Sequence, residues 1–407
     1  MTFRTSRVLG AIALLATVTP ALAQQQDSTT PYYVGVNGGY THLSNVFRQD
    51  GGTNSDNVLS ASLLGGVDLR LGRQHLRADG SLTSARYSRN SELNNSGYNG
   101  QLALDWSTIE RLQGTITVSG SEQLADYNIA SYLAPVYTKN TVKNYYADAV
   151  TYLGLVTRWS LMVDANYHKL DYSAPQYAIL NYEQRSWAVG PSWQPNPDLR
   201  VGMAWRQTSG DYPTYFHDTV TGAYGANDFR RRDLDLTVSW RSTGHNSFDG
   251  RLSTGRYPGA DTSGQTRNVH SGALTWRYEP TGKLVFLTSY VHDQGLSSFF
   301  YAGLGSSLNQ NSKTESLQFQ PSYQLTGKIT LNASAAYTRT SQDSEVLGTA
   351  IGAYHDTTRS LTFGASYAYS RSISANCQAS RQVRDSNLAG YSYAANTIGC
   401  NAQMLFF

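Results

Sequence analysis

The sequence predicts an all-β fold: a transmembrane antiparallel up-and-down β-barrel of about 18 strands, with 16 as the alternative count. Three observations predict it. Many short segments alternate apolar and polar residues, the chain opens with a segment typical of a cleavable export signal, and it ends on two phenylalanines. An alternating strand can turn its apolar face to lipid and its polar face to water. Inside a bilayer, only a closed sheet provides hydrogen-bond partners for all the backbone groups of such strands.

The first segment, residues 1–23, has the features of a secretory signal peptide. Arg4 and Arg7 give it a positive start, residues 8–18 form an apolar core, and Ala-Leu-Ala predicts cleavage after Ala23. The apolar core is too short to span a bilayer. We therefore expect export across the inner membrane and removal of this segment.

The composition limits the remaining choices. Residues 24–31 form a short polar tail, and residues 32–407 are expected to form one barrel domain without a plug. Only 40% of the chain is hydrophobic, and no later run approaches 18 apolar residues, which excludes transmembrane helices. Cleavage of the signal would lower the formal charge of +3 to about +1, so nucleic acid is not an expected partner.

The alternation is clearest in residues 233–240, where Leu234 and Leu236 interleave with Asp233 and Asp235. Period two places each set on one face of a strand. The apolar set would face lipid and the acidic set a wet interior. Comparable alternation occurs in residues 112–119, 317–325 and 329–338.

Connections of two lengths alternate along the chain. Tight turns are expected near Gly72-Arg73, Ile109-Glu110, Thr157-Arg158, Asn196-Pro197, Gly244-His245, Thr281-Gly282, Thr326-Gly327 and Arg371-Ser372. Longer loops are expected over roughly 44–57, 88–96, 125–140, 172–183, 211–228, 258–265, 295–314, 341–357 and 385–393. These 17 connections join 18 strands, with both chain ends on the short-turn, periplasmic side and the long loops outside.

Tryptophan supports the same orientation. Five of the seven tryptophans lie a few residues from an expected short turn: Trp106, Trp159, Trp193, Trp240 and Trp276. Such a cluster predicts an aromatic girdle at the periplasmic membrane interface.

Charged residues on the polar sets are candidates for the lining of the lumen. These residues are Arg77, Asp79, Asp105, Asp164, Arg206, Asp233, Asp235, Arg251 and Arg277. An excess of arginine would draw an anionic solute inward, but here the two signs nearly cancel. Salt bridges that stiffen the barrel wall explain the same pattern equally well.

Aromatic residues gather in the long loops, several of them beside proline. The candidates for saccharide contact are Tyr132, Tyr137, Tyr172, Tyr177, Tyr182, Tyr212, Tyr215, Phe216, Phe299, Phe300 and Tyr301. Aromatic rings bind the C–H faces of sugars, while neighbouring polar groups bind hydroxyls. An outer girdle and ordinary packing within the loops would give the same composition.

No catalytic or cofactor motif is present. The eight histidines are scattered, with neither an HExxH run nor a G-x-S-x-G elbow among them, so we expect a non-enzymatic protein without metal or cofactor. The only cysteines, Cys377 and Cys400, flank the last expected loop. A hairpin there would bring them roughly opposite each other, as a disulfide or as two small buried thiols.

A short motif adds a family resemblance. The chain reads Tyr-Thr-His-Leu-Ser-Asn-Val-Phe-Arg over residues 40–48, followed by Ser-Asp-Asn at 55–57 and the alternating strand 58–71. Together with Leu-Gly-Arg-Gln at 71–74 and the terminal Phe-Phe, this resembles the EpsL-type outer-membrane β-barrels that accompany exopolysaccharide biosynthesis and export clusters. The resemblance implies a role in moving or releasing a secreted polysaccharide, and it brings no catalytic residues.

We therefore expect an outer-membrane barrel that takes part in exopolysaccharide export by passive conduction. The alternatives are a general or sugar-selective porin, an adhesive or structural barrel, and a barrel enzyme. The expected partners are outer-membrane lipid and lipopolysaccharide, a polysaccharide, periplasmic export components, and the barrel-assembly machinery through the C-terminal Phe407.

Overall fold

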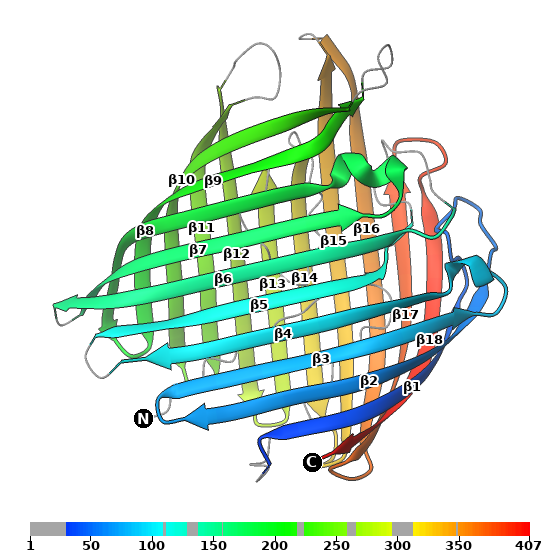
Figure 1. Cartoon of the computed structure of the whole chain (residues 1–407), viewed down its shortest axis with the longest axis horizontal. Coiled ribbons are helices and arrows are strands. Elements are labelled where there is room, and N and C mark those ends of the chain that lie inside the picture. The colour runs from blue at the N-terminus through cyan, green and yellow to red at the C-terminus, as the bar shows by residue number, and fades with distance from the viewer. Residues whose placement is uncertain are drawn as a thin grey trace.

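The structure is a computed structural model that describes residues 30–108, 111–127, 137–156, 158–217, 224–258, 266–294, 312–346 and 349–407. Its strands form one antiparallel sheet of 18 strands, in which each strand pairs with the next along the chain. The pairing of β1 with β18 closes the sheet into a barrel. The predicted fold class and the strand count of 18 are thus confirmed. In Figure 1 the strands of the near and far walls cross each other, as tilted strands of a barrel do.

The strands have the following bounds: β1 Tyr32–Leu43, β2 Asp56–Leu71, β3 Gln74–Tyr87, β4 Asn95–Ser107, β5 Leu112–Leu124, β6 Thr141–Val156, β7 Trp159–Tyr172, β8 Tyr182–Asn196, β9 Leu199–His217, β10 Tyr224–Thr243, β11 Asn246–Pro258, β12 Thr266–Thr281, β13 Leu284–Gln294, β14 Ser312–Gln324, β15 Ile329–Val346, β16 Thr349–Ala368, β17 Ile373–Ser386 and β18 Tyr393–Phe406. Two short 3₁₀ helices, η1 (Ser91–Leu93) and η2 (Pro175–Leu180), lie in the second and fourth long loops. No helix in the described part of the chain is long and apolar enough to cross a membrane.

The strands on either side of each expected short turn are those that it was predicted to join, and Ile109, Glu110 and Thr157 themselves lie outside the described residues. Two of the long loops differ from the prediction. The strands β9 and β10 continue to His217 and from Tyr224, and β15 and β16 continue to Val346 and from Thr349. The described residues within 211–228 and 341–357 are therefore strand. Alternation could not predict these strand ends, because a strand that projects beyond the bilayer does not need an apolar outer face.

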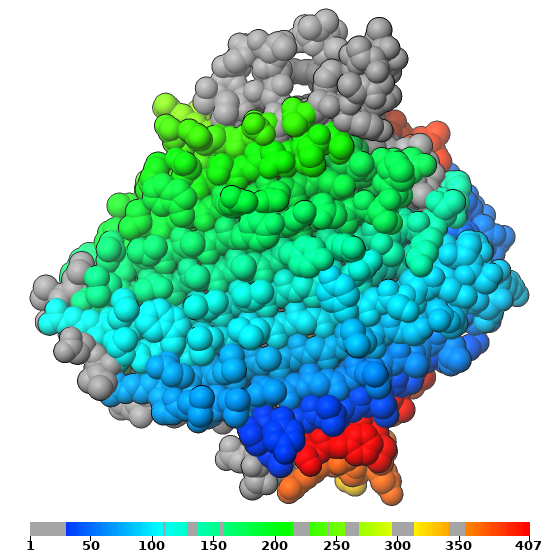
Figure 2. Space-filling view, in the orientation of Figure 1, coloured from blue at the N-terminus to red at the C-terminus, as the bar shows by residue number. Residues whose placement is uncertain are grey.

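The outward faces are apolar and the inward faces are polar. On β10, Leu234 and Leu236 are 48% and 44% exposed, whereas Asp233 and Asp235 are each 1% exposed. Figure 2 shows the outer wall as a continuous surface of tilted strands, from the blue first strands to the green strands near β9. This surface is the face that a bilayer would cover, because large aliphatic side chains stand on it with nothing packed over them.

A ladder of rings runs over the outer wall near the short turns. Trp240 stacks on Phe248 at 5.6 Å between ring centroids, Phe248 on Trp276 at 6.1 Å, and the ladder continues through Tyr278 to Phe286. On another part of the wall, Trp159 and Trp193 lie 6.2 Å apart. The tryptophans near the short turns thus form the aromatic girdle that the sequence predicted, and this end of the barrel faces the periplasm.

Candidate functional site

The inner wall over β7–β11 carries a buried network of charged side chains. Arg206 of β9 donates hydrogen bonds to Asp164 of β7 at 3.0 Å and to Asp235 of β10 at 2.7 Å. Arg251 of β11 donates to the same Asp235 at 2.8 Å, and Ser253 donates to its other oxygen at 2.6 Å. Arg206 therefore pairs with Asp235 on the neighbouring strand and reaches Asp164 across β8.

The positive and negative charges of this network are already paired with each other in the protein, without a solute. Arg206 is 2% exposed, so its guanidinium is held by protein groups and has little surface to offer a solute. A buried charge of this kind is stable only when its partners remain, because desolvation costs several kcal/mol per ion. Of the two interpretations given by the sequence, the salt-bridge interpretation describes these residues.

Other candidate lumen charges are paired in the same manner. Arg77 donates to Asp105 at 2.8 Å, and Arg277 bonds Glu279 of its own strand. Asp233 accepts a bond of 2.7 Å from Arg231, a buried residue whose role the sequence did not reveal. Arg231 also donates to Ser271 at 2.9 Å, which ties β10 to β12.

Two inward carboxylates are different. Asp79 of β3 and Asp249 of β11 are exposed within the barrel, and the described residues include no ion-pair partner for either. The sequence singled out Asp79 but not Asp249, although both follow from the period-two pattern. They are negative charges accessible from the lumen.

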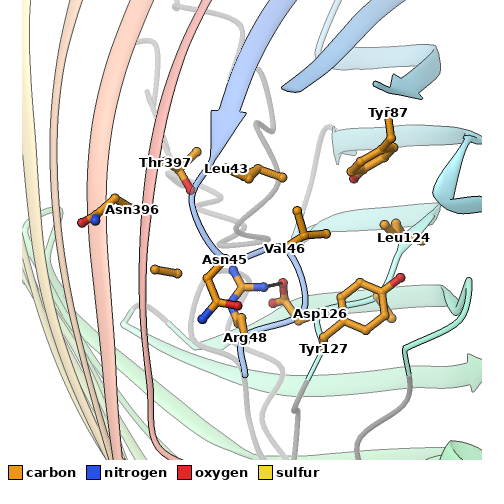
Figure 3. Close-up of a pocket in the computed structure, with 12 residues that line it drawn as sticks. Leu43, Asn45, Val46, Arg48, Tyr87, Leu124, Asp126, Tyr127, Asn396 and Thr397 are labelled. Atoms are coloured by element: carbon orange, nitrogen blue, oxygen red, sulfur yellow. Dashed lines mark hydrogen bonds and ion pairs between the residues drawn. The ribbon is translucent and has the colours of Figure 1, made fainter. Parts of the chain in front are cut away.

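The first long loop folds into the mouth of the barrel instead of standing away from it. Val46 and Phe47 pack against Tyr87 at the end of β3 and against Leu124 and Tyr127 at the end of β5. The rings of Phe47 and Tyr127 meet edge to face, with 5.0 Å between centroids. Figure 3 shows Val46, Tyr87, Leu124 and Tyr127 around a small cleft beneath this loop.

Arg48 holds the loop in place through contacts that cross the inside of the mouth. It donates to Asp126 at 2.9 Å, as Figure 3 shows, and to Gln382 of β17 at 2.9 Å. Burial opposes its charge, but attraction to Asp126 and Tyr393 outweighs burial, so the pKa of Arg48 is raised above its ordinary value. Its φ of 50° lies in the left-handed region, a strained conformation that the surrounding contacts must support.

The segment that carried the family resemblance therefore has a structural role in this chain. Asn45 donates to the carbonyls of Gln49 and Ala394, and Asp56 accepts backbone hydrogen bonds from Arg89 and Asn90. These bonds fasten the first loop to β18 and to the second loop. The motif residues fix an inward-folded loop that narrows the extracellular mouth.

Most of the described aromatic candidates for saccharide contact are buried against protein. Tyr177, Tyr182 and Tyr212 are only 1–2% exposed. Tyr182 bonds His168 and packs with Tyr212, while Tyr177 packs with Tyr172 beside it. The prediction that these three rings meet a sugar is corrected here, since Tyr182 and Tyr212 pack in an apolar cluster of strand residues and Tyr177 packs in a second cluster at η2.

The remaining aromatic candidates divide into two groups. Tyr137 is well exposed at the mouth, with its ring 5.7 Å from that of Phe47, and Tyr172 is half-buried. The others lie outside the described residues or have side chains that are not described: Tyr132, Tyr215, Phe216, Phe299, Phe300 and Tyr301. Tyr137 is thus the described ring that best keeps the predicted role.

The two cysteines form a disulfide. Cys377 of β17 and Cys400 of β18 are directly opposite each other in the strand register, and their sulfurs are bonded. Both lie on the outward face, between Ile373 and Ile398 on that surface. The bond fixes the last hairpin next to the seam at which β18 meets β1.

The structure shows no constellation for metal binding among the described residues, where no group of three or more His, Cys, Asp or Glu side chains could hold an ion. The deepest histidine, His168, bonds Asn144 at 2.8 Å and Tyr182 at 2.6 Å. These bonds tie β7 to its two neighbouring strands.

Comparison with known proteins finds matches among solved structures alone. No family model matches the chain, and no curated protein matches it in sequence. Among solved structures, OpdQ of Pseudomonas aeruginosa aligns over 92% of this chain and 98% of its own, with 12% identity and a TM-score of 0.45. OpdK of the same organism aligns over 92% and 99%, with 12% identity and a TM-score of 0.46. The copper transporter OprC aligns over 90% of this chain but 64% of its own, with 13% identity and a TM-score of 0.42.

The family is therefore not decided by these comparisons. The chain spans 64% of the length of OprC. The closed sheet, the apolar outer face and the girdle near the short turns establish from this chain alone that it is a β-barrel of the outer-membrane type.

Proposed function

We propose that this protein is an outer-membrane channel that takes part in the export of an exopolysaccharide by passive conduction. The observation that carries the proposal is the character of the inner wall. Polar side chains predominate on its described part, with an apolar cluster around Tyr182 and Tyr212, and the buried arginines on it already have carboxylate partners. A polymer rich in hydroxyl groups can exchange water for such a wall without meeting an unpaired buried charge.

The motif over residues 40–48 supports the choice of polymer, since it resembles barrels that accompany exopolysaccharide clusters. The arrangement requires no catalytic step. The barrel would provide a wet path through the membrane, and polymer synthesis and periplasmic components would supply the driving force.

A test in the host bacterium measures where the polymer goes. After deletion of this protein, released exopolysaccharide should fall and polymer should accumulate inside the cell envelope. Expression of the full chain should restore release. Unchanged release in the deletion strain, with normal amounts of the other envelope proteins, would remove the export proposal.

A diffusion porin is the second candidate, and one observation favours it. The first loop folds into the mouth and is held there by Arg48 and Asp126, as a loop that selects small solutes would be. Under this alternative, deletion would slow the uptake of small sugars and leave polymer release unchanged. The same strain therefore separates the two functions.

A further inference from the structure

The interior of the barrel has two walls of different chemistry. The wall over β7–β12 carries the paired charges described above. The wall over β14–β18 and β1 is uncharged: among its described inward side chains, Asp356 and Arg384 are the only charged ones, and they bond to each other at the mouth. In Figure 1, β7–β9 of the charged wall lie in front, and β14–β16 of the uncharged wall lie behind them.

Hydroxyl and amide groups line the uncharged wall. The strand register aligns Ser334 of β15, Thr362 of β16, Ser380 of β17 and Thr397 of β18 in one row around the barrel. A second row runs from Thr330 through Ser366, Asn376 and Asn401. Each row crosses four strands and presents groups that both donate and accept hydrogen bonds.

Some of these groups bond one another and others stay open. Asn376 donates to Ser366 at 2.7 Å, and Ser316 donates to Thr338 at 3.0 Å. The hydroxyls of Ser334, Thr362, Ser380 and Thr397 are half-buried on the inner face, and the described residues give them no side-chain partner. Such hydroxyls can donate to and accept from the hydroxyls of a solute.

From these observations we propose that the wall over β14–β18 and β1 binds an uncharged glycan chain. The inference rests on the proposed function and specifies its substrate class. Neutral sugar units present hydroxyl groups, which match a surface of hydroxyls and amides. An acidic polymer would need free cations along its path, and this wall offers none among its described side chains.

The charged wall supports the same choice. The guanidiniums of Arg206, Arg231 and Arg251 each bond a carboxylate, so they attract an anionic chain weakly. The accessible carboxylate of Asp249 on this wall would repel it, as would that of Asp79 on β3. Both walls therefore disfavour an acidic polymer, and the uncharged wall favours a neutral one.

The test uses the refolded full-length barrel in a planar bilayer at about 0.15 M salt, where charges are screened within about 8 Å. Two probes of equal length are compared: maltohexaose, which is neutral, and hexagalacturonate, which carries carboxylates. The concentration that halves the ionic current is measured at small voltages of both signs, because the field drives only the charged probe. We expect maltohexaose to block at the lower concentration.

A pair of matched variants locates the effect. T358V/T362V removes two hydroxyls from the uncharged wall with little change of shape, and it should weaken the block by maltohexaose about fivefold. T237V/T275V makes the same change on the wall over β10 and β12 and should leave the block unchanged. Conductance without probe should stay similar in both, which shows that both barrels fold.

The outcomes separate this inference from the function on which it rests. Equal or stronger block by hexagalacturonate, or equal weakening by the two variants, overturns the neutral-glycan wall while a polymer-conducting channel stands. An open channel that neither probe affects contradicts polymer conduction as well, and both proposals fall together.

Discussion

Replacement of Arg206 by methionine gives the sharpest test of the buried charge network. The change removes a guanidinium that is 2% exposed and that bonds both Asp164 and Asp235. Asp235 retains Arg251, but Asp164 loses the only ion-pair partner that the described residues give it. A buried carboxylate left without its partner costs about 3–5 kcal/mol, so R206M should lower the free energy of unfolding by about that amount.

A surface ion pair on the same barrel provides the control. Arg359 and Asp385 lie 3.6 Å apart with 64% and 60% of their side chains exposed. Exposed pairs of this kind contribute at most about 1 kcal/mol, so R359M should have a small effect. In the double variant R206M/D164N, the amide removes the orphaned charge, and part of the lost stability should return.

The assay is unfolding in urea from lipid vesicles, followed by tryptophan fluorescence. The two methionine variants and the double variant are compared with the parent protein under identical conditions. If R206M costs no more than R359M, the charges are not held as buried pairs and the account of the inner wall is wrong. Failure of D164N to restore stability would show that packing, not charge, explains the loss.

Three further predictions follow from other parts of the molecule. D79N/D249N should reduce the preference of the channel for potassium over chloride, measured as a reversal potential across a salt gradient. An unchanged potential would show that these carboxylates do not meet the permeating ions. In the double variant C377A/C400A the free energy of unfolding should be lower by about 3 kcal/mol, because the disulfide links two residues 23 positions apart in the last hairpin. Equal stability of the reduced and oxidised parent protein would contradict this. R48M should loosen the first loop and increase current fluctuations of single channels, and recordings as quiet as those of the parent would refute its role as the fastener of that loop.

The local features of this fold could be predicted from sequence because they depend on a period of two. The alternation around Leu234 and Asp235 determines which side chains face lipid, and the alternation of turn lengths determines the strand count. Both signals are contained within a few residues. The ends of β9 and β15 were missed because their outer parts leave the membrane, where apolar residues are no longer required.

The contacts within the candidate site depend on register and on long-range folding, which the sequence pattern does not contain. Arg206 meets Asp235 because β9 and β10 pair in one particular register. Arg48 reaches Gln382, which is 334 positions away in the sequence. Tyr182 and Tyr212 were expected in loops that bind sugar, but they lie in β8 and β9 and are buried against side chains of neighbouring strands. Burial of this kind depends on contacts between residues distant in the sequence, which the local pattern does not predict.

We propose that this barrel conducts a secreted polysaccharide. The most direct measurement is the single-channel conductance of the refolded protein in a planar bilayer, with and without fragments of the host's own exopolysaccharide. We expect an open channel that these fragments block at a lower concentration than unrelated sugars of the same length do. An open channel that responds to neither, or a barrel without conductance, would contradict it.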